Sequence, residues 1–391
     1  MPNGPANGPP NGPPNSPSYD IIFNPDGSML LPDLPQELVP AVTALGFTRP
    51  APAVIGTASA GPGRGSRGRP NWQQAKALRL PLAGPALETA ETGLLWELHE
   101  QALKSRKAQE IESRSGGASL LDLKTELARR ALVNCQLCEL RCGANRWAGH
   151  SGACGSDREA YYGRCFLNWS EEKHLIPGIM VYLNGCNWAC VYCQYPDHLT
   201  AKAGKVLEPE ALAGEIERLR QAGGVNIHWV GGNPDQSLWA VLRTLQACQA
   251  NLPIVWNSNG YTSSEALRLL EGVVDAYLVD FRYWEEACAR RYGAAPHSRE
   301  TIQRNLGLIA GQADELIVRH LQLPGHFECC TRPILEWLAA HLPETALNLM
   351  NGQYHPAHHA YRYPEINRRL TPAERQAADR LAASLGIKLI S

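Results

Sequence analysis

The sequence predicts an α/β fold, an open partial (β/α)6 barrel that follows an N-terminal helical segment and a cysteine-rich metal-binding segment. From residue 176 onward, short apolar runs alternate with amphipathic stretches, which is typical of parallel strands joined by right-handed helical crossovers. There are six such runs, too few to close an eight-stranded barrel, so we expect the barrel to be open.

The barrel elements are assigned from this alternation. The six predicted strands are Ile179–Asn184, Val225–Val230, Ile254–Ser258, Ala276–Phe281, Glu315–Leu321 and Leu347–Met350. The helices predicted between and after them are Glu208–Ala222, Gln236–Ala250, Ser263–Leu270, Arg299–Ala310 and Pro333–His341. Beyond the barrel, Thr371 is a predicted N-cap with Pro372 in the first helical turn, and Ile387–Ile390 is a candidate last strand.

Five segments follow from these patterns. Residues 1–75 are rich in Pro, Gly and Asn and are expected to be a disordered, low-complexity region. Residues 76–134 have the apolar spacing of helices, interrupted at Gly116-Gly117. The remaining segments are the cysteine-rich module 135–175, the barrel 176–355, and a C-terminal helix and strand over 356–391.

Composition narrows the class of protein. The formal net charge of -1 gives no support for a nucleic-acid or membrane-surface partner. No apolar run reaches the roughly 18 residues that span a bilayer, and the first residues lack the features of a secretory signal. We therefore expect a cytoplasmic chain. Eight of the twelve cysteines fall between Cys135 and Cys193, which favours metal binding or catalysis over disulfides.

Three cysteines, Cys186, Cys190 and Cys193, directly follow the first predicted strand of the barrel. Three thiolates on one tight loop can hold three irons of a [4Fe–4S] cubane and leave the fourth iron open to a substrate or cofactor. Chemistry in β/α folds gathers at the C-terminal ends of the strands, where this loop lies. The alternatives are a zinc loop completed by His198 or a distant cysteine, and buried free cysteines.

The segment CNWACVYC resembles the CxxxCxφC signature of radical S-adenosylmethionine (radical SAM) enzymes, with Tyr192 as the aromatic residue φ. The resemblance implies a [4Fe–4S] cluster on Cys186, Cys190 and Cys193, whose open iron binds the amino and carboxylate groups of S-adenosylmethionine (SAM). It also implies reductive cleavage of SAM to a 5′-deoxyadenosyl radical, which abstracts hydrogen from a substrate. A flavodoxin- or ferredoxin-like protein would be the low-potential electron donor.

The turn after the second strand is a predicted part of the SAM site. Gly231-Gly232 leave backbone carbonyls free to face a bound ammonium group, although an ordinary strand-to-helix turn has the same residues. The segment WVGGNPDQ resembles the GGE motif that holds the methionine amino group in radical SAM proteins. Asn233 replaces the usual acid of that motif, so charge pairing from this side chain is lost.

Polar residues at the ends of the next three strands complete the predicted cofactor site. Asn257 and Ser258 can contact ribose hydroxyls or a carboxylate, or can serve as ordinary turn residues. Asp280 lies in a strongly apolar strand and is expected to point at a polar partner, either the cofactor or a neighbouring arginine. Arg319 and His320 are adjacent and face opposite sides, and Arg319 is the expected inward partner of a carboxylate.

A second set of cysteines, Cys135, Cys138, Cys142 and Cys154, lies in a glycine-rich segment with few apolar residues. Four thiolates satisfy tetrahedral zinc or a four-cysteine iron–sulfur cluster, and the spacing does not decide between them. A redox-active disulfide is a third reading. We expect an auxiliary zinc or a second iron–sulfur cluster here.

The motifs from about Cys135 to the C-terminus resemble the PflX-like group of radical SAM proteins, which is related to pyruvate formate-lyase activating enzyme. These motifs are CxLCxxRCGANRxxGxxGxC, CNxxCVYCQ, VGGxP, VWNSNGY, RHLxLPG, the pair Cys329-Cys330, and RRLT. The resemblance implies an activating enzyme that forms a glycyl radical in a partner protein. The alternatives are radical modification of another peptide or a small molecule, and a non-catalytic, zinc-stabilised interaction protein.

The cysteines outside the two sets have simpler expected roles. Cys329-Cys330 are candidate extra ligands or core residues. Cys248 and Cys288 fall in helical patterns and are expected to be structural.

Overall fold

The computed structural model describes residues 22–23, 29–30, 69–108 and 117–390. The chain divides into two units, residues 1–61 and 62–391. In the first unit, the described residues form one antiparallel pair, β1 (Ile22–Phe23) with β2 (Met29–Leu30). The disorder expected over 1–75 falls mainly outside the described residues. Helix α2 (Asn71–Ala77) begins within that range.

An eight-stranded sheet forms the centre of the second unit, with the strand order β10-β9-β8-β7-β6-β4-β3-β5. All pairs from β10 to β4 are parallel, whereas β3 pairs antiparallel with β4 and β5. The sheet is open, because β10 and β5 form its two edges. The strands are β3 (Tyr161–Asn168), β4 (Gly178–Leu183), β5 (Lys205–Val206), β6 (Asn226–Gly231), β7 (Ile254–Ser258), β8 (Ala276–Asp280), β9 (Glu315–Leu321) and β10 (Ala346–Met350).

The strand count differs from the expected (β/α)6 pattern. Each of the six predicted strands is present, but β3 and β5 add two antiparallel strands at one edge. Strand β3 lies in the cysteine-rich segment and has mostly half-buried side chains, while both residues of β5 are exposed. A strand without one buried face lacks the alternation of apolar and polar residues that identifies strands in sequence.

Helices pack on one face of the sheet. They are α6 (Pro209–Gln221), α7 (Leu238–Ala247), α8 (Ser264–Leu270), α10 (Ser298–Ala310), α11 (Arg332–His341) and α12 (Pro372–Ser384). Alternate strand residues such as Ile227 and Trp229 join the main apolar core with these helices. Leu278 and Ile317 belong to a smaller apolar cluster on the other face. Because strand side chains alternate, His228 also lies on this other face.

Helix α12 has the expected N-cap. The Glu374 backbone N–H donates to Thr371 Oγ1 (3.2 Å), and the Thr371 N–H donates to Glu374 Oε2 (2.8 Å). Glu374 Oε1 also accepts from the Gly325 N–H (2.7 Å), which ties the start of α12 to the turn after β9. The last expected strand is reduced to one bridge, between Leu347 and Leu389.

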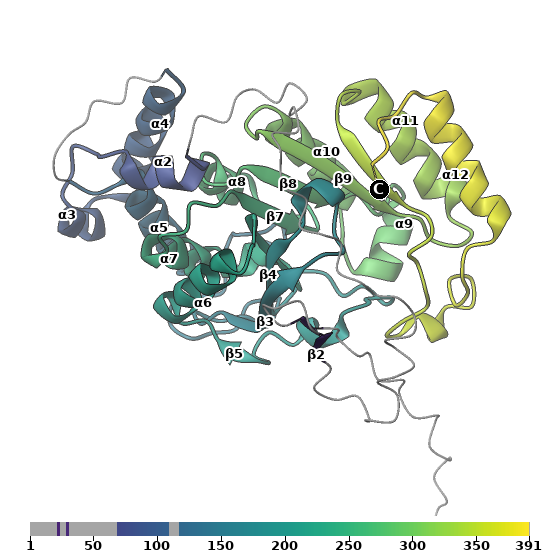
Figure 1. Cartoon of the computed structure of the whole chain (residues 1–391), viewed down its shortest axis with the longest axis horizontal. Coiled ribbons are helices and arrows are strands. Elements are labelled where there is room, and N and C mark those ends of the chain that lie inside the picture. The colour runs from purple at the N-terminus through teal and green to yellow at the C-terminus, as the bar shows by residue number, and fades with distance from the viewer. Residues whose placement is uncertain (1–21, 24–28, 31–68, 109–116, 391) are drawn as a thin grey trace, which may run out of the picture. The chain divides into compact units, whose positions relative to one another are not determined.

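The helices α2, α3 (Gly84–Thr89), α4 (Thr92–Ala108) and α5 (Leu120–Ala131) lie at the end of the second unit away from α11 and α12 (Figure 1). The apolar face expected for α5 is buried. The same helix carries Lys124, whose Nζ lies 2.7 Å from Nε2 of the buried His99 on α4. In the part of the chain that the structure describes, no helix is long and apolar enough to cross a membrane.

Candidate metal centre and cofactor site

Cys186, Cys190 and Cys193 lie on the irregular loop between β4 and the short helix η3 (Pro196–Leu199). Main-chain hydrogen bonds fix this cluster loop. The Ala189 N–H donates to the Gly293 carbonyl (2.9 Å) and the Val191 N–H to the Tyr292 carbonyl (2.8 Å). Both carbonyls come from the π-helical turn η5 (Ala289–Gly293) that follows β8. The cluster loop is therefore held against the segment that follows β8, a strand that β6 and β7 separate from β4 in the sheet.

Hydrogen-bond donors point at two of the three cluster-loop sulfurs. The Trp188 N–H lies 3.4 Å from Cys186 Sγ, and Asn259 Nδ2 lies 3.9 Å from the same sulfur. The Tyr283 hydroxyl lies 3.9 Å from Cys190 Sγ. Donors aimed at sulfur stabilise a thiolate, which is the form of cysteine that binds metals.

Burial disfavours the negatively charged thiolate form of these cysteines. It raises the pKa of Cys190 to about 11, while the positive charge of Arg282 acts in the opposite direction. Burial, followed by the charges of Cys190 and other neighbouring thiolates, raises the pKa of Cys186 well above its ordinary value. Three thiolates in this setting need a nearby cation to stay ionised at neutral pH, and iron supplies one.

The three cluster-loop sulfurs do not all lie within 4.8 Å of one another, as the ligands of one ion would. Among the described residues, the one group of three ligand atoms within 4.8 Å of one another is Cys288, His326 and Cys329, which lies outside the cluster loop. The cluster-loop sulfurs are more widely spaced, as expected where each thiolate binds a different iron. His198, the suggested fourth zinc ligand, uses Nδ1 for a 2.6 Å hydrogen bond to Asn184 Oδ1.

The Gly231-Gly232 turn packs directly against the cluster loop. The Gly232 N–H donates to the Leu183 carbonyl (2.8 Å), and the Asn233 N–H donates to the Gly185 carbonyl (2.9 Å). A Cβ atom at Gly232 would lie 2.1 Å from the Gly185 oxygen, and Gly231 has a φ of +124°. No other residue type allows two backbone segments to approach this closely.

Asn233, which stands where the GGE motif has its acid, is buried and forms hydrogen bonds to other residues of the protein. Its Oδ1 accepts from the Asn259 N–H (3.1 Å), which connects the ends of β6 and β7. The nearest carboxylate on this turn is the buried Asp235, which accepts from Trp256 Nε1 (3.0 Å) and the Thr262 hydroxyl (2.7 Å). Neither side chain is free to pair with a cofactor ammonium group in this arrangement.

The two polar residues at the end of β7 differ. Ser258 Oγ accepts from the Gly260 N–H (3.2 Å), which is the turn role considered for it. Asn257 is buried, and its side chain makes no hydrogen bond to another described residue. Asn257 is therefore the residue of this pair that is free to contact a ligand.

Asp280 and Arg319 have partners in the protein. Asp280 Oδ2 lies 2.8 Å from Arg282, the alternative partner considered for it. Arg319 lies 3.5 Å from Glu171 and 3.7 Å from Glu172. Burial opposes the charge of Arg319, but the surrounding acids raise its pKa.

Arg319 and its neighbour His320 lie on opposite faces of the sheet. His320 bonds to the Phe281 carbonyl (2.7 Å) and to the Thr331 hydroxyl (3.0 Å), on the helix-covered side of the sheet. Arg319 therefore lies on the opposite face, with the glutamates described above.

Tyr192 is buried against two other tyrosines. Its hydroxyl lies 2.5 Å from that of Tyr283, and its ring packs edge-on against Tyr354. These contacts anchor Tyr192, which lies within the cluster loop, in the protein core. Tyr283 was not among the predicted site residues, although its place just after the end of β8 indicates that it could reach the loop.

The auxiliary cysteines lie beside the cluster loop. A Cβ atom at Gly152 would lie 3.3 Å from Cys142 Sγ and 3.7 Å from Cys154 Sγ, so the two sulfurs flank this glycine. Burial raises the pKa of Cys138 to about 12, and the charge of Cys154 contributes to the raised pKa of both Cys138 and Cys186.

The module that carries these cysteines is anchored by its backbone and by one arginine. The Glu139 N–H donates to the Tyr261 carbonyl (3.1 Å) in the loop after β7. Arg146 is buried and donates to the Asp157 carbonyl (2.7 Å) and to Cys135 Sγ (3.7 Å). The set therefore forms a second group of thiols next to the first.

Comparison with known proteins agrees with this site. The Radical SAM superfamily model matches residues 180–338, which include the cluster loop. The uncharacterized protein MJ0674 of Methanocaldococcus jannaschii is 36% identical over 310 residues, which cover 77% of this chain and 90% of that protein.

Solved structures are more distant. The radical S-adenosylmethionine methyltransferase TsrM from Kitasatospora setae, with cobalamin and a [4Fe–4S] cluster bound, has 18% identity and a TM-score of 0.33, over 42% of this chain and 34% of TsrM. Streptococcus suis SuiB has 9% identity and a TM-score of 0.36, over 54% and 47%. HydG, a maturase of the [FeFe]-hydrogenase, has 13% identity and a TM-score of 0.37, over 78% and 65%.

The chain spans less than two thirds of the length of each of these three structures. The family assignment therefore depends on the superfamily match and on the archaeal relative, nearly all of which this chain covers. On these grounds the chain belongs to the radical SAM superfamily.

Proposed function

We propose that this protein is a radical SAM enzyme with a [4Fe–4S] cluster on Cys186, Cys190 and Cys193. The observation that carries the proposal is a loop of three spaced thiolates, packed against the Gly231-Gly232 turn. When bound, the cluster and SAM supply a 5′-deoxyadenosyl radical that abstracts hydrogen from a substrate.

The protein's own residues would hold the cluster and keep water away from it. Asn259 and Tyr283 donate toward the cluster sulfurs. The rings of Trp188, Tyr192 and Tyr283 are almost completely buried around the loop, so they keep water away from that side of the cluster. We assign cofactor contacts to the carbonyls of Gly231 and Gly232 and to the unpaired side chain of Asn257.

The substrate would approach over the face of the sheet that lacks helices. Several buried polar atoms on this face have no hydrogen-bond partner among the described residues, namely both ring nitrogens of His228, Arg319 Nε and Glu172 Oε2. Buried polar groups are normally paired, so these atoms suit a substrate with polar groups of its own. We call this face of the sheet, with His228, Arg319 and Glu172, the substrate floor. Arg319 is assigned to it because Glu171 and Glu172 hold the arginine there by ion pairs.

The finer proposal is that the substrate is a glycine Cα of a partner protein, as the sequence motifs suggest. The open sheet supports this, since it leaves an edge where a peptide loop can enter. The charged floor favours a second candidate, a small polar molecule or a peptide side chain. In either case the auxiliary cysteines would hold zinc or a second cluster.

Anaerobic reconstitution with iron, sulfide, SAM and dithionite tests the main proposal. We expect release of 5′-deoxyadenosine, and loss of that release in C190A. The control is C248A, which removes a buried cysteine at the end of α7, outside both cysteine sets. Equal release by C190A and the control would refute the proposal.

Co-expression with candidate glycyl-radical proteins tests the finer proposal. A glycyl-radical signal by electron paramagnetic resonance that disappears in C190A would support activation of a partner. Steady 5′-deoxyadenosine release without that signal would favour the second candidate.

A further inference from the structure

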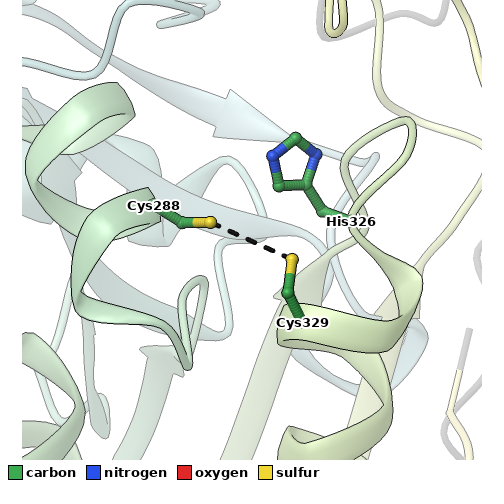
Figure 2. A group of neighbouring side chains, drawn as sticks. All are labelled: Cys288, His326 and Cys329. Carbon is green, nitrogen blue, oxygen red and sulfur yellow. Dashed lines mark hydrogen bonds between the residues drawn. The ribbon is translucent and has the colours of Figure 1, made fainter.

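A third group of metal-binding side chains lies outside both cysteine sets. Cys288 ends helix α9 (Glu286–Cys288) after β8, and His326 and Cys329 lie at the π-helical turn η6 (Phe327–Thr331) after β9. Their ligand atoms all lie within 4.8 Å of one another. Figure 2 shows the three side chains meeting from these two separate segments.

The sulfur spacing suits one tetrahedral ion. Two thiolates that each lie about 2.3 Å from a tetrahedral zinc are about 3.8 Å apart. Cys288 Sγ and Cys329 Sγ are 3.9 Å apart, nearly twice the roughly 2 Å length of a disulfide bond. Cys330 Sγ lies 3.7 Å from Cys329 Sγ and provides a further sulfur beside the group.

The histidine is oriented as a metal ligand. His326 Nδ1 lies 2.7 Å from the Pro324 carbonyl oxygen, and because a carbonyl only accepts, Nδ1 must carry the proton. Nε2 then keeps its lone pair, and it has no hydrogen bond to any described residue. Histidines that bind metals usually donate their other N–H to a carbonyl or carboxylate in this way.

We propose that Cys288, His326 and Cys329 bind a zinc ion. Two thiolates and one neutral imidazole are ligands that zinc prefers, and three protein ligands are enough for a stable site. The ion would join the segments that follow β8 and β9, which no other described covalent or metal link connects.

This site contacts the support of the cluster loop. The Tyr292 ring packs edge-on against His326, with 5.0 Å between ring centroids. The carbonyl of the same residue accepts from the Val191 N–H of the cluster loop (2.8 Å). Zinc would therefore fix the turn that positions Cys190 and Cys193.

Zinc content of the full-length protein, purified anaerobically and equilibrated with buffered Zn²⁺, tests the proposal. We expect C288A, H326A and C329A each to contain about one zinc ion less per chain than the wild type. C248A is the matched control and should keep the wild-type content. H326C should also keep it, because a thiolate can replace the imidazole.

A second measurement starts from the wild-type protein, whose folding no substitution affects. X-ray absorption at its zinc edge should show nitrogen as well as sulfur scatterers. In a folded H326C variant, which keeps its zinc, the nitrogen contribution should be lost. Equal zinc content in the wild type and all three alanine variants would overturn the proposal. A zinc shell of sulfur alone, or a Cys288–Cys329 disulfide in protein prepared in this way, would also overturn it.

Discussion

The hydroxyl of Tyr283 lies 3.9 Å from Cys190 Sγ, so a side chain from the segment after β8 reaches a sulfur of the cluster loop. The same hydroxyl is 2.5 Å from that of Tyr192, which leaves it held between the two residues. A donor aimed at a ligand sulfur stabilises the reduced, more negative form of an iron–sulfur cluster.

Tyr283→Phe should therefore make the reduction potential of the cluster more negative. If the hydrogen bond contributes about 1.4 kcal/mol more to the reduced form, the potential falls by roughly 60 mV. A redox titration followed by electron paramagnetic resonance measures this. An unchanged potential in a variant with full iron content would show that the hydroxyl only packs the loop.

Gly232→Ala should disrupt the cofactor site, because its Cβ would lie 2.1 Å from the Gly185 carbonyl oxygen, a backbone atom. We expect a loss of roughly 1–3 kcal/mol of folding free energy and a large loss of 5′-deoxyadenosine release. Gly214→Ala, on α6, is the control, since its Cβ meets nothing within 4 Å. That change should add up to about 1 kcal/mol of stability, and comparable damage in both variants would contradict the argument.

Lys124 should make stability depend on pH. Burial lowers its pKa from 10.5 to about 7, and burial followed by the charge of Lys124 lowers the pKa of His99 to about 2. A base with a lowered pKa binds fewer protons in the folded than in the unfolded protein. Stability should therefore rise as pH increases from about 7 toward 10.5, and fall as pH drops below 6.5, where unfolded His99 gains a proton.

Calorimetry between about pH 7 and 9 checks this prediction. Lys124→Met should flatten the rise, by up to about 1.4 kcal/mol per pH unit. Lys104→Met, which changes an exposed lysine on α4, should leave the slope unchanged. If the stability of the wild type and of the Lys124 variant changed with pH at the same rate, Lys124 would not be a neutral amine in the folded protein.

Arg319→Met should separate substrate binding from SAM cleavage. The change leaves Glu172, which is almost fully buried, without its cation, and breaking a buried pair from one side costs roughly 3–5 kcal/mol. If Arg319 lies on the substrate floor, release of 5′-deoxyadenosine without substrate should persist while product formation is lost. Arg332→Met, which removes an exposed ion pair with Glu328, should affect neither. Loss of substrate-free SAM cleavage would instead assign Arg319 to the cofactor.

The sequence predicts the parallel part of the sheet well, because each of its strands is a short apolar run between turn residues. Strands β7 and β9 begin and end at the predicted residues. The edge strand β3 could not be found in this way, since its side chains are only partly buried. The cluster loop was found because its three cysteines are close together in sequence.

The group of Cys288, His326 and Cys329 has no such local signal. The two cysteines are 41 residues apart in sequence and meet only because β8 and β9 are neighbours. Cys288 was accordingly expected to be structural. The proton on His326 Nδ1 depends on the Pro324 carbonyl two residues away, and no sequence pattern predicts that contact.

The carboxylate of Glu374 connects the C-terminal helix α12 to the turn that carries His326. It caps the first turn of α12 and also accepts a hydrogen bond from the Gly325 N–H, one residue before His326. A partner that displaced the terminal helix would break this hydrogen bond and free the turn that follows β9. A change at this helix would then reach the cluster loop through Tyr292, which packs against His326 and accepts a hydrogen bond from Val191.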